Sequence, residues 1–112
     1  MRDNRERLRD ILEAIEDIDR YAGRGKDAFL ADELVSTWIL HHLIILGEAA
    51  ASVDASFRDK FPEIPWPQIV AFRNILIHHY FGVDMDEVWE VVERELPELR
   101  RKIEAILDKT GE

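Results

Sequence analysis

The 112-residue chain is 46% hydrophobic and 35% charged, a composition typical of one globular domain, expected here over residues 1–112, and not of a disordered segment. It contains no cysteine, which excludes disulfides and thiolate metal sites and is compatible with a reducing cytoplasm. The net charge of −9 argues against a large phosphate-binding surface but leaves room for a small basic site.

The first predicted element is an amphipathic helix over residues 4–21. Its apolar residues recur at steps of three and four: Leu8, Ile11, Leu12, Ile15 and Ile18. The two glycines of "YAGRGK" supply the backbone conformations that a helix end needs. Asp27 is then expected to cap a short turn, "AFLADEL".

A long helix is predicted over residues 32–53. It is apolar on most sides, which favours a place at the centre of a bundle or at a contact between subunits. Gly47 and the following alanines would let another backbone approach closely. The run from Val35 to Ala51 looks too short and too polar to cross a membrane. The N-terminus, "MRDNRERLRD", lacks the apolar core of a signal peptide, so we expect a cytoplasmic protein without a membrane contact.

The prolines of "FPEIPWPQ" break the chain, and Pro65 and Pro67 suit the entry of a helix over residues 66–79. Its predicted apolar face is formed by Ile69, Val70, Phe72, Leu76 and Ile77, with Ile75 also holding it to the bundle. Gly82 could provide a left-handed cap.

Asp84 can cap the next helix, with Glu87 three residues on in a capping-box arrangement. Pro97 should break or restart that helix before a last apolar stripe, residues 99–107. The chain shows no strand pattern and no internal repeat. The prediction is an all-α antiparallel bundle of four to five helices.

Several classes of enzyme are excluded by missing motifs: there is no Walker loop, no dinucleotide-binding glycine motif and no HExxH. His41 and His42 are adjacent on a predicted helix and point about 100° apart, so they cannot readily bind one metal ion. We expect one of them buried and the other partly exposed. A four-histidine site with His78 and His79 has no supporting spacing, and no metal is expected.

Two charged residues stand in apolar surroundings. Glu48 lies in "ILGEAA" and Arg73 in "AFRNIL". A carboxylate in such a place needs a partner if it is buried, and Arg73 is the obvious one. The pair could be purely structural, or Glu48 could support a site by orienting Arg73.

The segment "RNILIHHYFG" (residues 73–82) carries the most chemistry. Arg73 can bind phosphate, Asn74 can donate and accept hydrogen bonds, and His78 or His79 can exchange protons near neutral pH. These groups suit phosphodiester cleavage without a metal. On one helix, however, Arg73 and His78 differ by about 140° in direction, so two copies about a twofold axis would converge more easily. A capped helix end with a buried arginine is the structural alternative.

The stretch "RNILIHHY" resembles the R-x4-H-x-Y motif of the HepT toxins in the HEPN superfamily, with Arg73, His78 and Tyr80 at the motif positions. Three further stretches also resemble that family: "ILGEAA", "PEIPWPQIVAFRN" and "YFGVDMDEVWEVVERELPEL". The likeness runs from the first helix to about Leu99.

The resemblance implies a HEPN-like helical domain that forms a homodimer, or a higher oligomer, with a metal-independent endoribonuclease cleft at the interface. Arg73 and His78 match the catalytic pair, and Asn74 matches an assisting polar position. His79 could share or replace the proton transfer of His78, but only His78 places Tyr80 at the motif tyrosine. The protein would be the toxin of a bacterial or archaeal toxin–antitoxin pair acting on RNA.

The resemblance also implies a partner, an MntA-like nucleotidyltransferase antitoxin. This enzyme would use ATP to attach AMP to Tyr80, and the toxin itself would need no cofactor. The alternative is a non-catalytic scaffold that binds a nucleotide or a protein for such a nucleotidyltransferase. A third reading is a structural dimer with a decayed site. RNA cleavage and a gain of mass in AMP steps would separate these functions.

Overall fold

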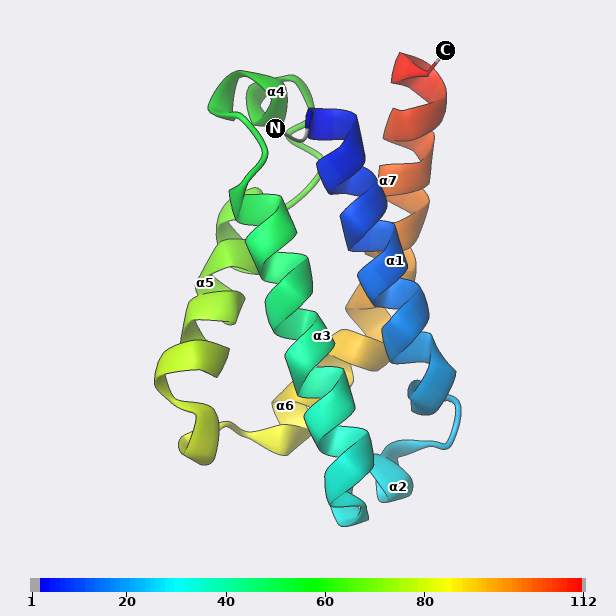
Figure 1. Cartoon of the computed structure of the whole chain (residues 1–112), viewed down its shortest axis with the longest axis vertical. Coiled ribbons are helices and arrows are strands. Elements are labelled where there is room, and N and C mark those ends of the chain that lie inside the picture. The colour runs from blue at the N-terminus through cyan, green and yellow to red at the C-terminus, as the bar shows by residue number, and fades with distance from the viewer. Residues whose placement is uncertain (1–2, 112) are drawn as a thin grey trace.

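The computed structural model describes residues 3–111, and within them the chain is helical throughout, with no strand. The long helices alternate in direction, so that neighbours in sequence run antiparallel (Figure 1). This confirms the predicted all-α class. In chain order the elements are α1 (Asn4–Ala22), α2 (Lys26–Ala31), α3 (Glu33–Ala51), α4 (Ala55–Lys60), α5 (Trp66–His78), a 3-10 turn η1 (Tyr80–Gly82), α6 (Met85–Glu90), a π-helical segment η2 (Val91–Glu95) and α7 (Leu96–Thr110).

The two helices predicted from the strongest patterns form with nearly the expected bounds. Asp3 and Glu6 form a reciprocal capping box that starts α1, which satisfies backbone amides that have no partner within the helix. The side chain of Asp32 accepts a hydrogen bond from the Leu34 amide (2.9 Å) and so caps α3. α1 and α3 pack along each other and form the centre of the bundle.

The short elements between the long helices differ from the prediction. Asp27 is not a cap: α2 begins one residue earlier, because Gly25 adopts φ of +94° and turns the chain there. Asp27 instead lies in the first turn, where its negative charge suits the helix dipole. A further short helix, α4, was not predicted from the sequence and contains no buried residue.

α5 ends at His78, one residue before the predicted end, and the chain then makes the 3-10 turn η1. Gly82 does not provide a left-handed cap, since its φ is not positive. The prediction that Ile75 and Ile77 hold α5 to the bundle is also wrong, because both are exposed while Leu76 between them is fully buried. Ile69 and Phe72 line an open groove of about 340 Å³ between α5 and the segment 91–99.

The last two predicted helices are joined into one. Asp84 caps α6 as expected, accepting hydrogen bonds from the amides of Asp86 and Glu87. Pro97 does not break the chain's helical path, because the wider turns of η2 precede it. Proline lacks an amide hydrogen and crowds the carbonyl four residues before it, and a widened turn accommodates both effects.

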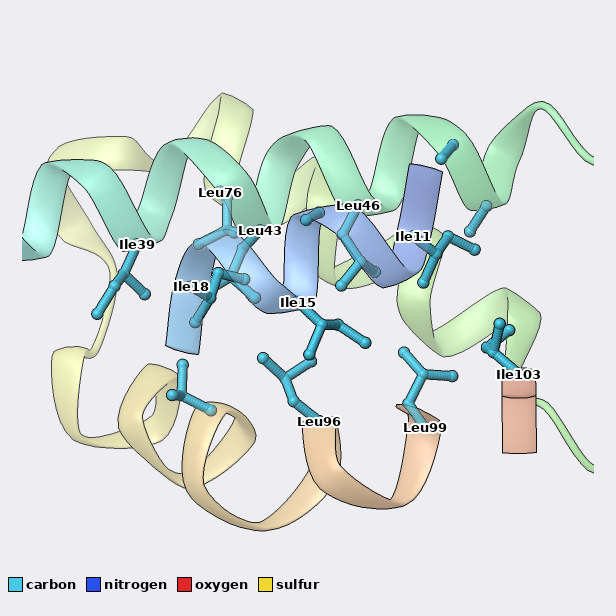
Figure 2. Packing of buried hydrophobic residues seen from close by; sticks show 14 of the residues in the cluster. Ile11, Ile15, Ile18, Ile39, Leu43, Leu46, Leu76, Leu96, Leu99 and Ile103 are labelled. Atoms are coloured by element: carbon cyan, nitrogen blue, oxygen red, sulfur yellow. The ribbon is translucent and has the colours of Figure 1, made fainter. Parts of the chain in front are cut away.

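The core lies where α1, α3 and α7 face one another, as Figure 2 shows. By length and composition alone α3 is apolar enough to cross a membrane, contrary to the expectation from residues 35–51. Half of that apolar segment is buried inside the bundle, which is the place of a core helix in a globular protein. The packed side chains include Ile11, Ile15, Ile18, Leu43, Leu46, Leu96, Leu99 and Ile103.

Replacing Leu76 by alanine is expected to lower the free energy of unfolding by about 2–5 kcal/mol, because it leaves a cavity at a fully buried anchor of α5. Urea unfolding followed by circular dichroism measures this loss. Leu107→Ala is the matched control, since that leucine is only partly buried and should cost less. Equal losses in the two variants would contradict the anchoring role of Leu76.

Candidate active site

Arg73 sits where α3 and α5 come closest. Its Cβ and Cγ atoms lie against the backbone of Gly47, in the space that a side chain would occupy at that position. The Arg73 side chain is only 16% exposed, but its charged end pairs with Glu48, a side chain that is 58% exposed. Packing therefore holds an arginine between two helices with its charged end outward.

The guanidinium of Arg73 has two partners. Its Nη1 atom lies 2.9 Å from a carboxylate oxygen of Glu48 on α3, and its Nε atom donates a hydrogen bond to Oδ1 of Asn74, also at 2.9 Å. The predicted pair of Glu48 and Arg73 is thus formed. The carboxylate is not buried, however: the Glu48 side chain is 58% exposed.

The predicted proton-transfer residues lie one turn further along. His78 is the last residue of α5, His79 follows it, and both are exposed. Within residues 3–111, no hydrogen bond or ion pair joins either histidine to Arg73. The helix from residue 66 to 78 is regular, so Arg73 and His78 keep the divergence of about 140° expected from the sequence.

Tyr80 starts the turn that follows α5 and is 37% exposed. Its ring meets the ring of Phe81 edge-on, with 5.4 Å between the centroids. Phe81 itself is 99% exposed. The turn thus presents two aromatic rings to solvent directly after the histidines.

The other two histidines belong to the bundle. His42 is buried and His41 is exposed, close to the prediction. The Nδ1 atom of His42 lies 2.8 Å from the carbonyl oxygen of Trp38, and its Nε2 atom lies 3.5 Å from Asp17 on α1. The sequence did not indicate the contact with Asp17, because it depends on the register of α1 against α3, whereas Trp38 lies one turn before His42 on α3 itself. Among the described residues no group of three or more His, Asp or Glu side chains could hold a metal ion.

Taken together, the fold and this site define a class: a small helical bundle that presents an oriented arginine, an amide and a histidine on one helix, a set of groups suited to phosphodiester chemistry. The family model of the ribonuclease HepT-like proteins matches residues 11–106. The chain belongs to this family, which confirms the resemblance to the HepT proteins of the HEPN superfamily and the enzyme class of ribonuclease.

Relatives of similar length carry names that agree with the family. "Putative RNase MJ1380" of Methanocaldococcus jannaschii is 35% identical over 106 residues, which cover 94% of this chain and 97% of that protein. "Probable ribonuclease HepT" of Thermococcus cleftensis is 36% identical over 106 residues, covering 94% and 96%. No solved structure gave a significant match.

Proposed function

We propose that the chain is a toxin endoribonuclease that needs no metal and works in a cleft shared by two copies. The observation that carries this proposal is the placement of Arg73, held by Glu48 and Asn74 with its guanidinium at the surface of α5, in a chain of the HepT-like family. The names of its relatives support RNA as the substrate.

The proposed reaction starts with a nitrogen of His78, which removes the proton from a ribose 2′-hydroxyl. The 2′-oxygen attacks the adjacent phosphorus, and the bond to the 5′-oxygen breaks. The leaving 5′-oxygen takes a proton from solvent water, and the protonated His78 returns its proton to the solvent. A 2′,3′-cyclic phosphate and a 5′-hydroxyl result. Arg73 stabilises the additional negative charge on the phosphorus oxygens, and Asn74 provides a polar contact. His79, the next residue, is the alternative general base for this proton transfer.

A second copy of the chain supplies the geometry that one helix lacks. Because Arg73 and His78 diverge on α5, a twofold contact across α3 and α5 would bring the arginine of one copy toward the histidine of the other. In the part of the chain that the structure describes, the large exposed apolar side chains come from α2, α3, α5 and η1, and they supply apolar surface for a contact between two copies. They are Leu30, Leu34, Ile45, Ile75, Ile77, Tyr80 and Phe81.

Neutralisation would act through Tyr80. Its exposure makes the hydroxyl accessible to a nucleotidyltransferase antitoxin of the MntA kind, which would transfer AMP from ATP to it in the cytoplasm. The added phosphates would stand two residues from His78 and would compete with RNA for Arg73. The acidic chain would also suit an antitoxin with a basic docking face.

The test of this function is to express the chain with and without its neighbouring nucleotidyltransferase gene. We expect RNA cleavage and growth arrest from the chain alone. With the partner, its intact mass should rise in AMP steps and cleavage should stop. Tyr80→Phe should prevent both changes while leaving cleavage by the free chain intact, since the phenol is not needed as the base.

The alternative is a non-catalytic scaffold for the nucleotidyltransferase. It is favoured by one observation: the contacts with Glu48 and Asn74 occupy two of the nitrogen atoms with which Arg73 could bind phosphate. A tight complex with the partner, without AMP transfer and without cleavage by the free chain, would establish the scaffold and contradict the toxin.

A further inference from the structure

Where α3 crosses α5, Gly47 and Arg73 make a contact that has no role in the reaction proposed above. A methyl group added to Gly47 would overlap the Cβ atom of Arg73 and would lie 2.6 Å from its Cγ atom. It would also lie 3.5 Å from the Arg73 Cα atom, so the backbones themselves are close. The first two carbons of the arginine thus occupy the place of the side chain that residue 47 lacks.

This contact decides where the guanidinium can go. A long arginine side chain on a free helix surface has many rotamers, and ordering it costs entropy. Here the stem is confined between the helices. From that stem the guanidinium reaches Glu48, the residue that follows Gly47 on α3, and Asn74, the residue that follows Arg73 on α5. Gly47 and Glu48 are thus neighbours on α3, and both contact Arg73: the first leaves space for its side-chain carbons and the second pairs with its charge.

We propose that Gly47 is a positioning residue, which leaves the space for the Arg73 stem and thereby aims the guanidinium at the cleft. The proposal rests on the ribonuclease function proposed above. Gly47 touches no substrate and acts only through Arg73. Misplacement of a catalytic group by about 1 Å is enough to slow an enzyme on the order of 100-fold, so one methyl group at this crossing should matter.

Gly47→Ala is the direct test, with Gly23→Ala as the matched control. A methyl group at Gly23 would meet only the carbonyl oxygen of Asp19, at an ordinary 3.9 Å, and that residue already has a helical φ of −62°. We expect Gly47→Ala to lower kcat for RNA cleavage about 10- to 100-fold, with a smaller change in KM, and Gly23→Ala to leave both close to the wild-type values.

A spectroscopic readout separates this proposal from the function on which it rests. The Nε–H group of Arg73 donates to Asn74 and should give a distinct resonance in a ¹⁵N–¹H spectrum, assigned by its loss in Arg73→Lys. Gly47→Ala should shift or broaden this resonance, and Gly23→Ala should not. If the wild-type chain cleaves no RNA, the ribonuclease function fails, while the resonance still reports whether Gly47 holds Arg73.

The stability of a double variant covers the case in which Gly47→Ala does not fold. In Arg73→Gly the two clashing carbons are absent, so adding Gly47→Ala should cost no stability relative to Arg73→Gly alone. A further loss in the double variant would show that Gly47 is required for another reason and would overturn the positioning role. An unchanged Arg73 resonance in folded Gly47→Ala, or an unchanged kcat in an active chain, would overturn it as well.

Discussion

His78→Ala is expected to lower the rate of RNA cleavage by about 10²–10⁴-fold, the usual contribution of a positioned general base. The reason is that the 2′-hydroxyl is a poor nucleophile until a base removes its proton. His78 is the last residue of α5 and is exposed, so the variant should fold as the wild type does. Cleavage of a labelled RNA and growth after induction measure the loss.

His79→Ala is the matched control for this prediction. The neighbouring histidine is also exposed but lies just past the helix end, where its φ of −127° and ψ of 37° are neither helical nor extended. We expect it to retain most of the activity. Activity that survives in His78→Ala and disappears in His79→Ala would show that His79, not His78, is the general base. Toxicity that survives in both variants would show that neither histidine takes part in the reaction.

The long helices could be predicted from the sequence because several local signals agree there. α1 combines a regular apolar stripe with the Asp3 capping box, and α3 follows the cap of Asp32. The short elements lack such agreement. α4 has only six residues and buries none of them, so no periodicity marks it. The chain stays helical through Pro97 because the widened turns of η2 relieve the clash that a proline normally causes in a helix. The sequence alone shows the proline but not these turns, so it predicts a break.

The candidate site could be predicted in part for a similar reason. A lone carboxylate and a lone arginine in apolar surroundings each need a partner, and this predicted the pair of Glu48 and Arg73. The sequence also indicated that another backbone would approach Gly47, but not that Arg73 is the residue whose side-chain carbons pack there. That contact depends on the crossing of α3 and α5, which no local pattern encodes. The same limit applies to His42 and its contact with Asp17.

Arg73→Ala is expected to reduce cleavage by about 10²–10³-fold, because it removes the cation that faces the additional charge of the transition state. Arg73→Lys should recover only part of this loss, since an ammonium group keeps the charge but not the planar fork that binds phosphate. The pair with Glu48 is partly exposed, so its loss alone should change stability by no more than about 1 kcal/mol. Arg73→Ala also removes the side-chain carbons packed against Gly47 and should cost more than Arg73→Lys, which keeps most of them. Thermal unfolding checks this point beside the activity assay.

Mixing two inactive variants then tests whether the cleft is shared. In a dimer of one Arg73→Ala chain and one His78→Ala chain, one cleft would combine the intact histidine of the first chain with the intact arginine of the second. The other cleft would lack both. Co-expression should therefore restore cleavage that neither variant shows alone. If both residues of each cleft came from the same chain, no mixed dimer would contain a complete site. The absence of restored activity would therefore contradict the proposed twofold arrangement, which the divergence of Arg73 and His78 on α5 favours.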